Sequence, residues 1–541
     1  MKLNYKKTMF VGLAFFLISL FWQAYDSIIP KILTDKFGMD HFWSGAIMAI
    51  DNILALFLLP LFGSLSDRTK TKRGRRTPFI IFGTVIAATA LIGLSCVDSA
   101  QLQNLKPIEA VVDRADEGYE EAMSVLYDSS SDVIVKVDDE KVKLSDAFTK
   151  EEFVGMWESI KAEVGYVESD TLDSESKALK KLADDEYAAF ETEIINPARQ
   201  DYAADVVSAG PSLLVIFICV LLVVLFAMAT FRSPAVALMP DVTVKPLRSK
   251  ANAIINLMGT FGGIIVLVLG MVFGTGETVN ALMNYIPFLA VVAGIMLVAL
   301  VIFLFTVNEP KLVRQMQEDT QKYGILDTEE DEKKSIGGKL TKPQLRSLFF
   351  ILASVILWYM GYNAVTSKYS VYAGDVLGLD YNVTLIIAQA AAVCAYVPAG
   401  IVASKIGRRK TILAGIVFLA VAFFGASFLA APCNIWLVNA LFILAGIGWA
   451  TINVNSYPMV VELSSGGDVG KYTGFYYTAS MAAQTLTPML SGLFLKHISM
   501  RTLFPYATVF VVLAFFTMLC VRHGDGLAEQ KNDRLEAFDV D

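Results

Sequence analysis

Three of the charged residues within long apolar runs lie deep inside them, where a charge is costly and usually serves a function. Asp26, Asp51 and Arg232 each stand within such a run. Asp26 lies about 16 residues beyond Phe10, and Asp51 lies about 16 residues before Asp67. A helical rise of 1.5 Å per residue places both carboxylates about 24 Å from the same edge of the apolar layer. We therefore expect the two carboxylates to face one cavity at similar height.

These side chains have the chemistry to carry protons. A carboxylate at that depth can bind a proton, and a nearby arginine favours its release. Arg232 lies nine residues before Asp241, about 14 Å from the same edge of the apolar layer as the two aspartates. Its long side chain reduces the difference in height between its charge and the two carboxylates. We expect Asp51 and Asp26 to couple proton movement to function, with Arg232 as the counter-charge. The alternative is a buried ion pair that only fixes helix packing.

Uncharged amides accompany these charges in several of the runs. Amides exchange hydrogen bonds with hydroxyl groups, and neighbouring aromatic rings stack on the apolar face of a sugar. This combination favours a polyhydroxylated ligand, although amides in membrane helices also serve as hydrogen-bonding contacts between helices. The candidate ligand-binding residues are Asn52, Asn252, Asn256, Asn363, Asn453 and Gln484.

Other kinds of chemistry lack their sequence signatures. The chain has no Walker A sequence, no HExxH and no GxSxG in a strand context, and its five cysteines form no CxxC. Its three histidines lie outside the apolar runs. We expect no cofactor, no bound metal and no enzymatic activity, so an ion gradient is the expected source of energy.

The chain that positions these residues is dominated by membrane spans. It has 541 residues, of which 55% are hydrophobic and 18% charged, and a mean hydropathy of +0.53. Runs of about 20 apolar residues cross a bilayer, and they do so as helices because lipid cannot satisfy backbone polar groups. We predict an all-α protein with twelve spans, at 9–33, 43–66, 78–97, 211–239, 250–273, 284–307, 346–371, 383–404, 411–431, 435–460, 472–495 and 502–522.

Charge predicts how the spans are oriented. Residues 68–76 hold six basic side chains between the second and third spans, and short basic loops stay cytoplasmic. Both termini then lie in the cytoplasm of a cell-membrane protein. Residues 98–210 carry 28 acidic and 11 basic residues and fall on the outer side.

The predicted organisation has six parts. They are 1–97 with spans one to three, the outer acidic insert 98–210, 211–307 with spans four to six, a cytoplasmic linker 308–345, 346–524 with spans seven to twelve, and a cytoplasmic tail 525–541. Within the insert we predict helices over 108–126, 148–164 and 176–195 and a hairpin over 133–144. The insert either folds as a solvated cap without chemistry or binds a partner.

A glycine, acidic and basic motif links the second and third spans, and a weaker copy follows the eighth. The first copy comprises Gly63, Asp67, Arg68, Gly74, Arg75 and Arg76; the second runs from Gly400 through Ser404 to Lys410. A motif that recurs six helices later indicates two parallel six-helix halves. We expect the first copy to lock one side of the bundle during conformational change, and the second, with Ser404 in place of an aspartate, to contribute less.

Together with the twelve spans, these motifs resemble the major facilitator superfamily. Narrower likenesses are Ser66-Asp67-Arg68 with Gly74-Arg75-Arg76-Thr77-Pro78, and the run from Arg232 to Asp241. They resemble the sucrose/proton symporters and the glycoside–pentoside–hexuronide:cation symporter group. The resemblance implies a symporter that imports a disaccharide or related glycoside by alternating access. It does not extend to residues 98–210, which these families generally lack.

One departure bears on the coupling ion. The sodium-coupled members carry acidic residues at the positions of Leu59 and Ala55, so the resemblance implies coupling to protons here. We expect as partners a sugar or glycoside, a coupling cation and membrane lipid, no nucleic acid, and a monomeric chain. An exporter or lipid transporter on the same fold, and a membrane-anchored sensor that binds through the insert, stay open as alternatives.

Overall fold

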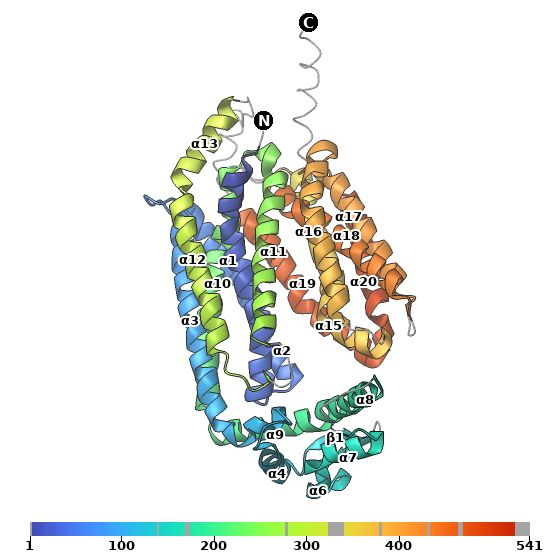
Figure 1. The fold of residues 1–541 in the computed structure, drawn as a ribbon. Coiled ribbons are helices and arrows are strands. Elements are labelled where there is room, and N and C mark those ends of the chain that lie inside the picture. Colours follow the sequence, from blue (N-terminus) through green and yellow to red (C-terminus); the bar gives the residue numbers. More distant parts are fainter. Residues whose placement is uncertain are drawn as a thin grey trace.

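The computed structural model describes residues 3–137, 140–167, 174–275, 280–322, 340–377, 381–429, 433–463 and 469–524. Within these ranges the chain is helical apart from one two-stranded sheet (Figure 1). The predicted all-α membrane fold is confirmed. The predicted tail 525–541 and residues 323–339 of the predicted linker lie outside the described residues.

The first half contributes six long helices. They are α1 (Tyr5–Lys31, extended by the π-turn η1, Ile32–Lys36), α2 (His41–Arg68), α3 (Thr77–Asn104), α10 (Ser212–Val242), α11 (Arg248–Val272) and α12 (Ile286–Thr306). Polar side chains start two of them: the Asn4 side-chain oxygen accepts from the Lys7 amide (3.1 Å), and Asp40 accepts from the Trp43 amide (2.7 Å).

The second half contributes another six. They are α15 (Lys342–Tyr372, followed by η6, Ala373–Leu377), α16 (Tyr381–Ile406), α17 (Arg408–Ala426), α18 (Ile435–Val461), α19 (Val469–His497) and α20 (Leu503–Leu519, preceded by η7, Met500–Thr502). In the described part of the chain eleven helices are long and apolar enough to cross a membrane. The twelfth, α19, has 29 residues and packs between α2 and α15.

The two halves meet along pairs of helices. α2 packs on α19 and α11 packs on α16 (Figure 1). In addition, α10 contacts α19, and α11 contacts α18. We call the end of the bundle that holds residues 68–77 the motif side and the opposite end the insert side. A short helix, α13 (Glu309–Lys322), follows α12 on the motif side, within the predicted linker.

The insert has a hydrophobic core of its own, which includes Met123, Leu126, Phe153 and Ile195. Its elements are η2 (Lys106–Val112), α4 (Tyr119–Ser129), β1 (Ile134–Val137), β2 (Glu140–Lys143), α5 (Leu144–Ala147), α6 (Lys150–Val154), α7 (Met156–Val164), α8 (Ser174–Phe190), η3 (Glu191–Ile195), and α9 (Asn196–Ala209). The predicted hairpin is present, with Ile134 opposite Lys143 in an antiparallel pair.

The single helix predicted over 108–126 is wrong, because two aspartates break it. Asp113 accepts a hydrogen bond from the Ala115 amide (2.9 Å), and Asp116 accepts one from the Gly118 amide (2.8 Å). Such local turns compete with helical hydrogen bonds. The segment therefore folds as a 3-10 turn, η2, a loop and then α4.

Buried contacts fix the insert to the first half of the bundle. Lys36 and Asp98 form an ion pair of 2.7 Å in which both side chains are fully buried. Lys36 also donates to the Met283 carbonyl (2.7 Å), and Gln101 donates to the Lys36 carbonyl (2.9 Å). At Gly38, whose φ is +64°, a side chain would strike the backbone of α9. The contacts of Lys36 thus join η1, α3 and the segment before α12. The insert is fixed to these elements by α9, which packs at Gly38 and whose Gln200 donates to the Met39 carbonyl.

Candidate functional site

The three intramembrane charges of the sequence come together between the halves. Arg232 on α10 lies 5.2 Å from the ring centre of Trp22 on α1 and 5.2 Å from that of Tyr477 on α19. Asp26 interacts electrostatically with Asp51 and Arg232, and Asp51 interacts with Arg232. We call Asp26, Asp51 and Arg232 the charged cluster.

Neighbouring residues show which way the carboxylates face. Asp26 is exposed, although Tyr25 and Ile28 on the same turns of α1 are buried. Asp51 is half-buried on α2. Because both carboxylates interact with a guanidinium that lies between α1 and α19, they face the interior of the bundle. Two carboxylates and one arginine in this arrangement can take up and release protons.

Aromatic residues of the second half complete the surroundings of Arg232. Tyr362 on α15 stacks flat on Trp449 of α18, with ring centres 3.7 Å apart. Tyr359, one turn earlier, places its hydroxyl 3.5 Å from that of Tyr476 and interacts electrostatically with Arg232. Tyr359, Tyr362 and Trp449 were not among the residues predicted from the sequence. The spacing of three between the tyrosines was the available signal.

Several buried polar atoms close to this region have no hydrogen-bond partner among the described residues. They are Trp22 Nε1, Tyr25 Oη, Asn52 Oδ1 and Asn363 Nδ2. Buried polar groups normally have partners, so such atoms commonly mark a place that water or a ligand completes. They come from α1, α2 and α15, which belong to both halves.

The other predicted amides lie in different surroundings. Asn252 on α11 is buried and donates to the carbonyls of Val454 (2.7 Å) and Asn453 (3.4 Å) on α18, so it joins the halves. Asn256 donates to the Asn252 carbonyl in its own helix (2.8 Å). Gln484 is half-buried on α19. The described contacts do not connect these amides to the charged cluster.

The glycine motif builds a charge network on the motif side. Arg76 is fully buried and pairs with Asp67 and, at 2.8 Å, with Asp241 at the end of α10. Arg75 donates to both oxygens of Asp241 (2.6 and 3.1 Å), whereas Arg68 is exposed at the end of α2. A bidentate arginine and a buried one hold α2, α3 and α10 together.

Close backbone approach brings the second half onto this network. A Cβ atom at Gly63 would lie 2.8 Å from the Gly470 carbonyl, and one at Gly470 would overlap the Asp67 carboxylate. The start of α19 therefore rests directly on the end of α2, a contact that only glycine permits at these positions.

Helix α13 is tied to the same loop through Glu309. This buried carboxylate accepts hydrogen bonds from the amides of Arg75 (2.8 Å), Arg76 (3.0 Å) and Thr77 (2.8 Å) and from the Thr77 hydroxyl (2.8 Å). It thus caps the start of α3. Gly74, with φ of +108°, leaves the space, because a Cβ there would overlap the Glu309 carboxyl group.

The second motif copy makes its own connection across the halves. Arg408 donates to Glu462 (2.8 Å), to the Ser249 hydroxyl (2.8 Å) and to the Lys245 carbonyl (3.1 Å). Burial would raise the pKa of Glu462, but the positive charges of Arg408 and the nearby Arg248 outweigh it and hold that pKa below its ordinary value. Among the described contacts, Ser404 donates to a carbonyl of its own helix (2.7 Å). The second copy therefore closes the bundle through Arg408 and needs no acidic residue at position 404.

Comparison with known proteins agrees with this architecture. A family model of the Major Facilitator Superfamily matches residues 203–397 and 384–537, and one described as MFS/sugar transport protein matches residues 10–99. The chain is 33% identical over 64 residues to "Putative glycoside/cation symporter YagG" of Escherichia coli (strain K12) and 37% identical over 71 residues to "Sucrose transport protein SUC4" of Arabidopsis thaliana. Each match covers 12–13% of this chain and 14% of the relative.

Solved structures match over almost the whole length. The proton:xylose symporter XylE bound to 6-bromo-6-deoxy-D-glucose superposes with a TM-score of 0.58 at 13% identity, covering 96% of each chain. The transporter FucP in the outward conformation gives 0.53 at 9% identity, covering 95% of this chain and 98% of the other. At such identities these likenesses establish the fold alone. With twelve helices in two halves and a family model matching more than half its length, the chain belongs to the major facilitator superfamily of membrane transporters.

Proposed function

We propose that this transporter is a proton-coupled symporter that imports a disaccharide or related glycoside by alternating access. The observation that carries the proposal is the charged cluster, which lies between the halves beside aromatic rings from both. The printed names of the two curated relatives, a glycoside/cation symporter and a sucrose transport protein, favour the sugar class.

The charged cluster supplies a simple coupling step. With both carboxylates ionised, Asp26 and Asp51 attract Arg232 and hold it away from a neutral ligand. Protonation of one carboxylate removes that attraction, so the guanidinium can donate hydrogen bonds to sugar hydroxyls instead. Release of the proton restores the attraction and weakens sugar binding. Proton and sugar therefore bind together and leave together.

Two features favour protons over sodium. Leu59 and Ala55, where a sodium-coupled member has carboxylates, are buried against Met481 of α19, so they offer no oxygen ligand. The charged cluster itself includes a permanent cation, Arg232, which would repel a bound sodium ion. A proton needs only one of the carboxylates.

Sugar binding is assigned to groups with unused hydrogen-bonding capacity. Asn52 and Asn363 offer buried amide atoms, and the stacked pair of Tyr362 and Trp449 offers an aromatic face. Gln484, Asn256 and Asn453 remain candidates for further hydroxyl contacts. We assign Asn252 mainly to closure, because its amide already bonds α18.

We further propose that the motif side is cytoplasmic and the insert side external, with the protein in the cell membrane. The basic loop of residues 68–76 carries this orientation. The structure then has its cytoplasmic side closed by the contacts of α2 with α19 and of Arg408 with α11. Import requires these contacts to separate, while the opposite side closes.

Transport assays in sealed vesicles test the proposal. Purified protein is reconstituted and given labelled sucrose, melibiose, maltose or xylose, with and without an imposed proton gradient. We expect accumulation of one or more disaccharides only with the gradient. Accumulation that follows an imposed sodium gradient at constant pH instead would overturn proton coupling.

Asp51→Asn separates coupling from binding. We expect the variant to lose uphill accumulation while keeping downhill exchange of labelled for unlabelled sugar, because an amide cannot release a proton. Asp319→Asn, an exposed carboxylate on α13, is the matched control and should accumulate sugar normally. Full uphill uptake by Asp51→Asn would remove Asp51 from the mechanism.

A further inference from the structure

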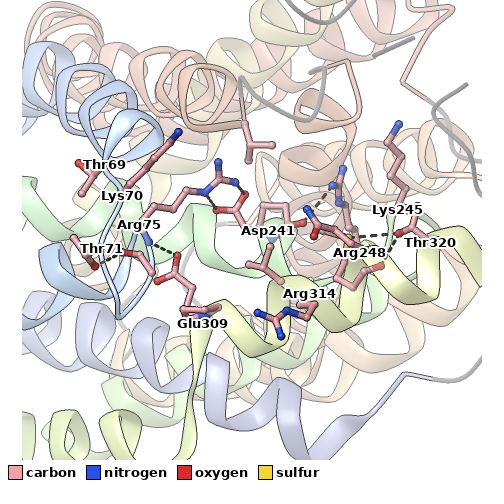
Figure 2. A pocket seen from close by; sticks show the side chains of 17 residues that line it. Thr69, Lys70, Thr71, Arg75, Asp241, Lys245, Arg248, Glu309, Arg314 and Thr320 are labelled. Carbon is pink, nitrogen blue, oxygen red and sulfur yellow. Dashed lines mark hydrogen bonds and ion pairs between the residues drawn. The ribbon is translucent and has the colours of Figure 1, made fainter. Parts of the chain in front are cut away.

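A pocket of about 520 Å³ opens on the motif side, away from the charged cluster (Figure 2). It lies between the α2–α3 loop, the end of α10 with the start of α11, and α13. Its lining includes Lys70, Arg75, Lys245, Arg248 and Arg314. Val469, at the start of α19, is its one contribution from the second half among the described lining residues. Its size suits a small molecule or a lipid headgroup.

Positive charge dominates the walls. The lining has five basic side chains and two acidic ones, Asp241 and Glu309. Both carboxylates are already engaged, Asp241 by Arg75 and Arg76 and Glu309 by backbone amides. Among the lining residues the basic side chains therefore exceed the acidic ones by three. Arg248 also lies 3.9 Å from Glu462, outside the lining, so the positive charge of the pocket rests mainly on its rim.

The rim residues are the most available of these cations. Lys70 comes from the loop after α2 and Arg314 from α13, and both are exposed. In the described part of the chain neither forms an ion pair. Thr69, Thr71 and Thr320 add hydroxyl groups to the same lining. Several basic groups from separate elements, with hydroxyls between them, are the usual means of holding a phosphate group.

We propose that this pocket binds a phosphate group, carried either by a small soluble anion or by the headgroup of an anionic lipid. The pocket lies at the bundle end where helix termini meet lipid headgroups and solvent, so both sources have access. The occupant bridges the motif loop, α10 and α13 and touches α19. It therefore stabilises the arrangement in which the motif side is closed. The proposal goes beyond sugar transport, since binding needs neither sugar nor proton gradient.

Ligand-dependent thermal unfolding in nanodiscs tests the site. Inorganic phosphate is titrated at constant ionic strength into protein held in phosphatidylcholine, which carries no net charge. In a second arm phosphatidylglycerol replaces part of the phosphatidylcholine, without added phosphate. A saturable rise of the unfolding midpoint in the first arm identifies a soluble anion, and a rise in the second identifies the lipid headgroup; either supports the site.

Two double variants make the test specific. K70Q/R314Q removes two rim cations. We expect the phosphate or lipid concentration at half-saturation to rise roughly tenfold or more, because each charge-assisted contact contributes measurably to binding. K72Q/K311Q makes the same charge change in the same loop and the same helix, at exposed residues outside the lining, and should bind as the wild type does.

Two outcomes overturn the proposal. One is that neither phosphate nor phosphatidylglycerol raises the unfolding midpoint of the wild type. The other is that K72Q/K311Q loses as much binding as K70Q/R314Q, since the effect would then reflect overall charge. Because all four substituted side chains are exposed, the ligand-free midpoints of both variants should match the wild type and show that folding is intact.

Discussion

Replacing Glu309 by alanine should release α13 from the bundle. The carboxylate is 1% exposed and accepts hydrogen bonds from three consecutive backbone amides and one hydroxyl at the start of α3. Alanine leaves these donors buried without acceptors and removes the one side chain that ties α13 to the motif loop among the described contacts. The detachment of α13 should therefore increase far more than after a substitution at an exposed position of the same helix.

The expected size follows from these contacts. A hydrogen bond to a charged group contributes about 1.5–3 kcal/mol net, and such contributions at one carboxylate do not add fully. We take about 3 kcal/mol for the detachment of α13. Since about 1.4 kcal/mol is a factor of ten, the detached population should rise on the order of 100-fold. Glu309→Gln keeps a carbonyl acceptor and should raise it by about tenfold.

Limited trypsin digestion of the detergent-solubilised protein measures this population. Cleavage after Arg314, detected by mass spectrometry as a peptide that begins at Gln315, follows the open fraction when opening is faster than cleavage. The matched control is Glu318→Ala, at an exposed position of the same helix. If Glu309→Ala is cleaved within about twofold of the wild type and of this control, the capping role assigned to Glu309 is refuted.

Three further changes test other contacts. Gly63→Val adds a Cβ atom that would lie 2.8 Å from a backbone carbonyl of α19, so vesicle uptake should fall about tenfold or more at normal abundance, and unchanged uptake would contradict the close contact. Lys36→Met leaves the buried charge of Asp98 without a partner and should lower the free energy of unfolding by about 3–5 kcal/mol. Adding Asp98→Leu should recover most of this loss, and an equal loss in the single and the double variant would argue against the ion pair. The folded pKa of Glu462 is depressed, so its pairing with Arg408 stabilises the protein fully above the ordinary pKa of 4.5, and this stabilisation is lost as pH falls through the lowered value. The difference in thermal unfolding midpoint between the wild type and Glu462→Gln should therefore be constant from about pH 5 to 8 and shrink only in stronger acid.

Hydropathy was sufficient to predict the helical bundle, because lipid leaves an apolar run of this length few alternatives to a helix. The predicted span ends were less accurate. Asp98 was assigned to the acidic insert by its charge, whereas α3 continues to Asn104 and carries Asp98 into a buried pair with Lys36. A charge that finds a partner far along the chain cannot be told from a solvated one by local sequence.

The candidate site shows the same division. Asp26, Asp51 and Arg232 could be singled out because unpaired charge is rare within spans. The spacing of three between Tyr359 and Tyr362 was too weak a signal to single out Tyr359, since the chain has 35 phenylalanines and 20 tyrosines. Glu309 stood in a polar segment with no local sign of burial, and its partners lie more than 230 residues earlier in the chain.

The anchorage of the insert gives it a practical use. Helix α9 of the insert packs against Gly38, and its Arg199 and Gln200 contact Asp35 and the Met39 carbonyl, so the insert turns with the first six helices as one body. An antibody fragment bound to α8 would mark the orientation of the first half from outside the bilayer. In electron micrographs the angle between this fragment and helices α15–α20 would measure the rotation of one half against the other, without any label on the helices themselves.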